Sequence, residues 1–433
     1  MSFLLKFIDE LAEEEDDELI EVLKNEYGHF LFLAMIFPRW KKPLASFGLV
    51  LFYLSTIVLH HAMLSYAVYL SLLEHNWEQV SFLTHLVILL SFAIFQPVNF
   101  NWVRRVVAHV HRTLAKDVGI YCSGRIYDDP VCIAFREKIR LEKKFYMTMS
   151  AFCLMMGGIL WSGLYISKSF SDIEQSYSSS GLSLKLPLAL YYPFPTDRGV
   201  LHYVILGSQL LVCLVIGFLY LICEVLLINL FLKIKYELQV IGYAIDSLVS
   251  RSINAVGVNE NNPQKDVLVI EDTKLQRSVE KCLKETIVHY QKILGLLLIA
   301  RANLDAPLAI VMMLGLLVIG ISLLNMLAAL KANYIGMFLT FGMLVCAEIQ
   351  AQLLVCLLGS SITEQADILR EKLYSIEWYC FDMKNRRILL NFQACFTKSF
   401  VVTAGGIAEI NMVTFSWILR AAYRFFNLMR STS

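Results

Sequence analysis

The chain has 433 residues, of which 57% are hydrophobic and 17% are charged, and its mean hydropathy is +0.58. A chain of this length could form two or three soluble domains, but so apolar a composition argues against them and is typical of a protein that crosses a membrane several times. The formal net charge of +1 gives no reason to expect nucleic acid as a partner.

Residues 1–43 are expected to form a cytosolic amino-terminal segment. They carry an acidic run at 13–18 and then a short apolar patch at 30–37, which Pro38 ends. A helix needs about 20 apolar residues to cross a bilayer, so this patch is too short to span. We expect it to lie in the membrane interface.

Seven long apolar segments follow, and each could cross a bilayer as an α-helix. None shows the strict alternation of apolar and polar residues that a membrane β-barrel requires. The sequence therefore predicts an all-α membrane protein with seven transmembrane helices. The predicted spans are 44–73, 80–98, 145–166, 200–227, 307–330, 333–358 and 400–429.

The positive charges of the loops predict the orientation, because cytosolic loops carry an excess of Lys and Arg. Alternate segments, starting with the amino-terminal one, hold 28 of the 38 Lys and Arg residues, whereas the loops between them hold only four. The amino terminus is therefore expected in the cytosol, and seven crossings then put the carboxyl terminus outside the cell. G-protein-coupled receptors have the opposite orientation, which disfavours that class.

The segments between the spans differ in composition. The outer loop at 167–199 begins Ser-rich and ends with closely spaced prolines, so it is predicted to be a stiff lid over the outer half of the first six helices, residues 44–358. The cytosolic loop at about 250–273 is polar and is expected to be mobile. Residues 359–399 are expected to form a cytosolic anchor region where subunits meet. Residues 400–433 are expected to hold a last helix that lines a pore.

The third predicted span places a glycine beside large apolar side chains. Leu154, Gly157 and Trp161 lie at i, i+3 and i+7, so they share one face of the helix. A glycine next to a tryptophan leaves a notch that suits a small apolar ligand. The alternative is that small residues here let two helices approach closely, as is common in membranes.

Apolar and aromatic residues also gather at the outer ends of other spans. Together they are expected to form a cage with few hydrogen-bonding groups around a small organic ligand. For the tyrosines, the alternative is the aromatic belt that membrane proteins carry at the interface. The predicted members are Phe82, Leu89, Phe92, Tyr203, Leu206, Gln209, Tyr334, Met337, Phe338 and Phe341.

Ionisable residues inside the predicted spans are costly, so they tend to face a water-filled path or a partner helix. Glu409 lies deepest in the span at 400–429, where an acid that faces a pore would attract cations. A hydrogen-bonded structural acid is the alternative. Arg301 and Asp305, four residues apart near the fifth span, are expected to pair with each other.

No set of residues indicates an enzyme. The nine histidines are scattered, and the sequence has no metalloprotease, serine-hydrolase or phosphate-loop motif. No CxxC pair occurs among the ten cysteines, so no zinc site is expected. The chain is therefore expected to work without catalytic residues, a cofactor or a metal.

The stretch from Cys356 to Arg430 carries an ordered set of residues that resembles the carboxyl-terminal signature of insect odorant receptors. The loop at 191–195 resembles the Tyr-Pro-Phe loop before the fourth span of that family. The matching positions are Gly359, Thr363, Glu364, Tyr374, Trp378, Tyr379, Arg386, Arg387, Thr403, Ala404, Gly405, Thr414, Phe415, Tyr423 and the closing run Phe425 to Arg430.

The resemblance implies a subunit of a tetrameric, odorant-gated, non-selective cation channel in the plasma membrane of olfactory sensory neurons. A small volatile organic ligand would bind in the outer half of the second to sixth spans, and the last span of each subunit would line the pore within the lipid bilayer. Phe426, Met429 and Arg430 share one helix face and would form the gate. Arg424 departs from the small residue that the family usually has there.

Three related or alternative classes of protein differ from this chain in sequence features that can be compared. Gustatory-type channels share the fold but usually carry a Gln in the last span where this chain has Ala421, which disfavours that branch. The co-receptor of the family has a longer loop between its fourth and fifth spans, so this chain resembles a ligand-tuning subunit that pairs with it. A secondary transporter of small apolar molecules is a further alternative, although no internal repeat is visible.

Overall fold

The computed structural model describes most of the chain, which is largely α-helical in that part. The predicted interfacial patch at 30–37 lies outside the described residues, as do residues 257–271 of the predicted cytosolic loop. The described residues are 43–115, 118–121, 126–170, 177, 181–183, 185–188, 190–256, 272–331, 333–396 and 401–432.

The described elements are long helices with few short pieces between them. Each of the first six predicted spans falls in one long helix, and the last falls partly in a seventh. In chain order the elements are α4 (Pro43–Leu73), α5 (Trp77–Ala115), the 3₁₀ helix η1 (Ile126–Asp128), α6 (Pro130–Phe170), α7 (Val200–Asp246), α8 (Leu248–Val256), α10 (Thr273–Lys331), α11 (Ile335–Ser375), the 3₁₀ helix η2 (Trp378–Cys380), α12 (Met383–Ala394), the strands β1 (Thr403–Ala404) and β2 (Ala408–Glu409), and α13 (Met412–Thr432).

The predicted start of the last span is wrong. We expected a helix over 400–429, but the chain first forms the antiparallel pair β1–β2, and α13 begins only at Met412. Gly405 and Gly406 both adopt φ of 66°, a conformation that favours glycine, and so turn the chain back on itself. Glu409 therefore lies exposed in β2 and not inside a membrane helix. Apolar composition alone could not distinguish this short hairpin from the first turns of a helix.

Length and hydropathy identify four of the described segments as able to cross a membrane: Leu54–Leu73, Val200–Asp246, Thr273–Lys331 and Ile335–Ser375. The helix α10 has 59 residues. A helix of that length rises about 90 Å, roughly three times the hydrocarbon thickness of a bilayer. The long helices therefore continue well beyond any membrane that they cross.

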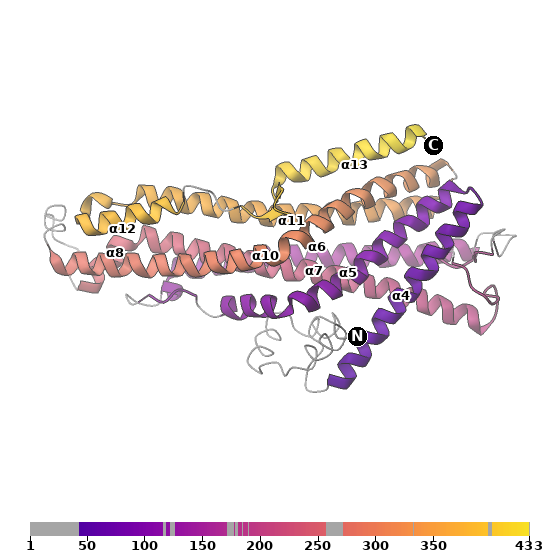
Figure 1. Ribbon diagram of the computed structural model, residues 1–433, viewed down its shortest axis with the longest axis horizontal. Coiled ribbons are helices and arrows are strands. Elements are labelled where there is room, and N and C mark those ends of the chain that lie inside the picture. Colours follow the sequence, from indigo (N-terminus) through magenta and orange to yellow (C-terminus); the bar gives the residue numbers. More distant parts are fainter. Residues whose placement is uncertain are drawn as a thin grey trace, which may run out of the picture.

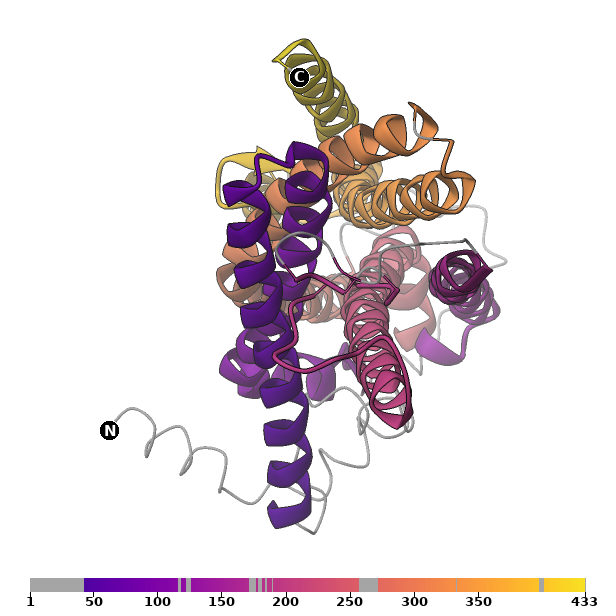
Figure 2. The same ribbon diagram turned by 90° about the vertical axis from the view of Figure 1, so that its right-hand side faces the viewer.

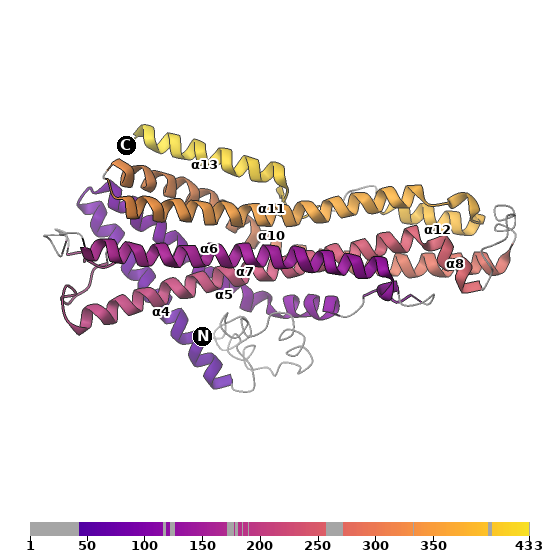
Figure 3. The ribbon, with the colours of Figure 1, turned by 180° about the vertical axis from the view of Figure 1, so that it is seen from behind.

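The molecule is elongated, and its two ends are built differently. The helices α6, α7, α10 and α11 run along the long axis (Figures 1 and 3), while α4, α5 and α13 flank them toward one end. At the other end α8 and α12 lie against the extensions of these helices. The carboxyl terminus lies at the same end as the connection between α4 and α5 (Figure 1).

Two apolar clusters form the main part of the core. The larger cluster joins α7, α10, α11 and α12, and includes Ile410 beside the hairpin. The smaller one joins α4, α5 and α7, and takes in Leu182, Leu188 and Leu190 from the outer loop. The described part of this loop therefore packs into the helix bundle.

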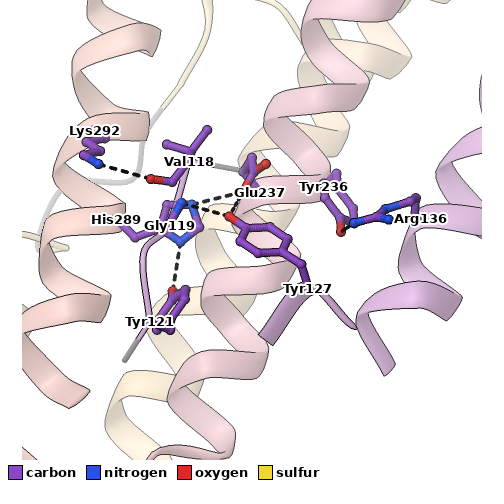
Figure 4. Close-up of polar contacts among 9 residues, drawn as sticks. All are labelled: Val118, Gly119, Tyr121, Tyr127, Arg136, Tyr236, Glu237, His289 and Lys292. Atoms are coloured by element: carbon purple, nitrogen blue, oxygen red, sulfur yellow. Dashed lines mark hydrogen bonds and ion pairs between the residues drawn. The ribbon is translucent and has the colours of Figure 1, made fainter. Parts of the chain in front are cut away.

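A buried polar network holds the connection between α5 and α6 against the long helices (Figure 4). The Glu237 carboxylate on α7 accepts hydrogen bonds from the Tyr127 hydroxyl at 2.8 Å and from Nε2 of His289, on α10, at 3.0 Å. The other His289 ring nitrogen lies 2.8 Å from the Tyr121 hydroxyl. The Tyr127 hydroxyl also accepts the N–H of Gly119 at 2.9 Å. Burial raises the pKa of Tyr121 and of Tyr127, so both hydroxyls stay protonated and can donate hydrogen bonds.

We expect Tyr127→Phe to destabilise the protein by about 1–3 kcal/mol, because it leaves a buried N–H unpaired and removes one donor from a carboxylate. Thermal unfolding of the purified protein, followed by size-exclusion chromatography, measures this. Tyr236→Phe is the matched control, since among the described residues the Tyr236 hydroxyl accepts one hydrogen bond, from Arg136 at an exposed site. Equal losses in the two variants would contradict a special role for the buried network.

Candidate functional site

The end of the molecule near the outer loop contains most of the predicted ligand-contacting residues. Figure 2 looks onto this end and shows α4 and α5 on one side, with α6, α7, α10 and α11 packed beside them. The predicted residues come from α5, α6, α7 and α11. The structure brings some of them into contact and separates others.

Phe341 joins α11 to α5. Its side chain is 2% exposed, and its ring lies edge-on to Phe82 with centroids 5.7 Å apart. Edge-to-face pairs at this distance are favourable beyond the area that they bury. These two predicted residues therefore form one aromatic contact across the bundle, as expected for an apolar cage.

His85 belongs to the same contact and is not among the residues predicted from the sequence. The ring lies 5.7 Å from that of Phe341, and Nδ1 lies 3.1 Å from the hydroxyl oxygen of Ser322 on α10. The side chain is fully buried, and Nε2 has no hydrogen-bond partner among the described residues. His85 follows Phe82 by three residues and precedes Leu89 by four, so helical spacing could have placed it on the predicted face.

Contacts between α6 and α7 favour the packing alternative for Leu154. A Cβ atom added at Gly217 would lie only 2.4 Å from the Leu154 Cδ1 atom, so this leucine fills the space that the glycine leaves. Gly157 and Trp161 lie on α6, but their side-chain surroundings are outside the described part of the structure. Phe92 contacts the ring of Tyr220 on α7, with centroids 6.2 Å apart.

Gln209 fastens the outer loop to α7. Its side chain is fully buried, its Oε1 atom accepts the N–H of Leu188 at 3.1 Å, and its Nε2 atom donates to the Leu188 carbonyl at 3.1 Å. The same nitrogen donates to the Tyr192 hydroxyl at 3.0 Å. The amide pairs with both backbone polar groups of one loop residue, Leu188. Both polar atoms of this amide therefore bond to the outer loop.

The remaining predicted residues are exposed or partly buried, and the ring of one of them, Tyr203, lies edge-on to that of its neighbour His202 with centroids 5.5 Å apart. Tyr203 and Tyr334 are 69% and 62% exposed near the starts of α7 and α11, as an aromatic belt requires. The others are partly buried side chains on the same helices: Leu89, Leu206, Met337 and Phe338.

The hairpin before α13 is held by α10 and α11. The Thr403 hydroxyl donates to the Asp305 carboxylate at 2.7 Å, and the N–H of Gly405 donates to the Asp305 backbone carbonyl at 2.9 Å. On the other side, a Cβ atom at Gly359 would lie 2.4 Å from the Ile410 carbonyl oxygen. The expected pair of Asp305 with Arg301 is therefore replaced by a contact to the hairpin, because the chain that precedes α13 reaches this carboxylate.

The helix α13 packs on the bundle through one face only. Ile418 and Ala422 are buried, and Phe425 lies over Gly320 of α10, where a Cβ atom would come within 2.4 Å of its ring. The opposite face is exposed and carries Arg420 and Arg424. In this helix the Arg430 guanidinium lies 6.0 Å from the centre of the Phe426 ring, while Met429 is 41% exposed.

We expect Gln209→Leu to weaken the attachment of the outer loop, because the buried N–H of Leu188 would lose its partner at about 1–3 kcal/mol, while the Leu188 carbonyl would keep the N–H of Leu190. Faster proteolysis of the loop at 185–199 and a lower unfolding temperature would show this. Ser208→Ala is the control, since that hydroxyl bonds only to the Ile205 carbonyl of its own helix. A loop that stays as resistant as in the wild type would contradict the assignment.

Comparison with known proteins identifies the family. The family described as 7tm Odorant receptor matches residues 129–423. The solved structure of the insect olfactory receptor OR5 from Machilis hrabei in complex with eugenol has a TM-score of 0.72 to this chain at 14% identity, and it covers 96% of this chain and 100% of that one. A second OR5 structure, not described as a complex, gives a TM-score of 0.69 at 14% identity with the same coverage.

A curated relative agrees with this assignment. Odorant receptor 88a of Drosophila melanogaster is 30% identical over 77 residues, which is 18% of this chain and 19% of that protein, so the match spans about a fifth of the relative. The predicted seven-helix membrane fold is confirmed by the structural match. The family is one of receptors and not of enzymes, in agreement with the prediction from the sequence. The chain belongs to the odorant receptor family.

Proposed function

We propose that this chain is a ligand-tuning subunit of an odorant-gated, non-selective cation channel, assembled with co-receptor subunits in the plasma membrane of olfactory sensory neurons. The family match to residues 129–423 carries the proposal, because that range includes α6, α7, α10, α11 and most of α13. The amino terminus would be cytosolic and the carboxyl terminus extracellular. The region at 359–399 would supply subunit contacts.

The proposed ligand is a small volatile organic molecule. The contact of Phe82 with Phe341 supplies an aromatic wall, and His85 is a polar group beside it. Gly157 and Trp161 on α6 would add to this lining. The relative OR5 of Machilis hrabei was solved in complex with eugenol, which is a molecule of this size. Such a site discriminates mainly by shape, since one methylene is worth about 1–3 kcal/mol.

The proposed pore lining is α13. This helix contacts α10 and α11, while Val413, Trp417 and Leu428 on it are 77%, 58% and 62% exposed. Exposed apolar side chains in this number suit a helix that lies between subunits. Arg420 and Arg424 on the exposed side would not attract cations, so the co-receptor subunits would supply most of the charge selection.

Current recording tests the function directly. Cells that express this chain with the co-receptor should give an inward cation current to some members of an odorant panel, whereas cells with the co-receptor alone should not respond to them. The current should reverse near the potential expected for a non-selective cation pore. Saturable ligand flux without unitary openings would instead indicate a transporter.

Cysteine substitution tests the proposed gate. A water-soluble thiol reagent applied during odorant should block channels with cysteine at Phe426 or Met429. Cysteine at Phe425 should stay unreactive, because that side chain packs on Gly320. If the reagent blocks none of these variants while their channels still open, this end of α13 does not line the pore.

We expect Thr403→Val to reduce the odorant-evoked current while the protein still reaches the cell surface. The hydroxyl that holds the hairpin to the Asp305 carboxylate is lost, and a hydrogen bond to a charged group is worth about 1.5–3 kcal/mol. A movement of α10 would then displace α13 less, because the hairpin that joins α13 to α10 is held less firmly. Thr403→Ser keeps the hydroxyl and should keep the current, so equal loss in both variants would show that the bond does not matter for gating.

A further inference from the structure

A groove on the amino-terminal part of α10 combines charged and exposed apolar side chains. It has a volume of about 440 Å³ and lies between α10 and the described segment at 118–121. Arg277, Lys281 and Lys284 line it and lie at i, i+4 and i+7, so they share one face of the helix. The groove therefore presents a row of three cations along α10.

Ile120 lines the other side of the groove, in the segment that the buried network holds in place. Its neighbour Tyr121 has its hydroxyl 2.8 Å from Nδ1 of His289, and the Val118 carbonyl accepts a hydrogen bond from Lys292 at 3.2 Å (Figure 4). His289 and Lys292 both belong to α10. The two sides of the groove are therefore joined to each other without an occupant.

Positive charge exceeds negative charge around the groove. Glu280, one of the two acids that line it, accepts hydrogen bonds from Lys284 at 2.7 Å and from Lys384 of α12 at 2.6 Å. The other acid is Glu285. The remaining two cations of the row form no ion pair with any residue that the structure describes. The groove is therefore suited to an acidic occupant.

The apolar side chains of the groove lie where lipid would not cover them. Ile120 is 74% exposed and Val288 is 49% exposed, and both line the groove. Val288 precedes the predicted span at 307–330 by about 28 Å of helix, so it lies well outside that span. An occupant that matches this surface therefore has apolar residues directly beside its acids.

We propose that the acidic run at 13–18 of the same chain, with Leu19 and Ile20 after it, binds this groove. The run consists of six consecutive acids, which complement the row of cations, and the two apolar residues would cover Ile120 and Val288. The run itself lies outside the described residues. Its binding would tie the amino terminus to the connection between α5 and α6.

The chain between the run and α4 is long enough for this contact. Residues 19–42 separate the run from Pro43, where α4 begins. Fully extended, such a segment spans up to about 80 Å, which approaches the rise of about 90 Å of the whole of α10. The run must also be on the cytosolic side, so the proposal rests on the orientation given under the proposed function.

Photo-crosslinking of the full-length protein in cell membranes tests the contact. With p-benzoylphenylalanine in place of Ile120, irradiation should crosslink this position to residues 7–24, which trypsin releases by cleaving after Lys6 and Lys24. Mass spectrometry identifies the product, which should migrate as a monomer. The same substitution at Leu141, which is 67% exposed on α6, is the matched control and should not give this product.

Charge reversal makes the result specific. Arg277→Glu combined with Lys281→Glu should abolish the crosslink, and 1 M salt should weaken it, because the Debye length is then only about 3 Å. Adding Glu14→Lys and Asp17→Lys to that double variant should restore the crosslink, which a misfolded protein would not do. The matched control reverses two exposed cations of α6, Lys138→Glu with Arg140→Glu, and should leave the crosslink unchanged.

Four outcomes would overturn the proposal: no crosslink to residues 7–24, a crosslink that persists after charge reversal, a crosslink to a different segment, or a product found only as a dimer. An epitope tag at the amino terminus separates this failure from that of the proposed orientation. A tag that stains without permeabilisation would overturn both. A tag that stains only after permeabilisation, in a protein that gives no crosslink, would overturn the groove contact alone.

Discussion

A bilayer supplies no water to backbone polar groups, so each N–H and C=O that enters it must find a partner within the protein. Long unbroken helices meet this demand, and α7, α10 and α11 continue through both ends of the molecule in that form. The hairpin before α13 departs from it. It is tolerated because Asp305 of α10 accepts the Gly405 N–H, while Gly359 of α11 leaves room for the Ile410 carbonyl.

The helix α10 connects regions that lie far apart. Near its carboxyl end Ser322 contacts His85, and Gly320 receives Phe425 of α13. In its middle Asp305 holds the hairpin, and toward its amino end His289 belongs to the buried network around Glu237. A ligand beside α5 and α10 could therefore act on α13 through one continuous helix. The size of this effect is limited by how much more tightly the ligand binds one arrangement of α10 than the other.

The positions that resemble the family signature acquire physical roles in the structure. Gly359 allows a close backbone approach, Gly405 turns the hairpin with a positive φ, and Thr403 bonds to Asp305. All three act at the joint between α13 and the bundle.

Hydropathy is a local property, and the sequence by itself determined which apolar segments lie in the long helices, although several of these helices extend far beyond the predicted spans. It did not determine where α13 begins, because Gly405 and Gly406 reverse the chain within an apolar run. Only the tertiary structure decided that Gln209 holds Leu188 and that Asp305 bonds to Thr403 and not to Arg301. Such partners lie many residues apart, and periodicity contains no information on which distant groups a folded chain brings within hydrogen-bond distance.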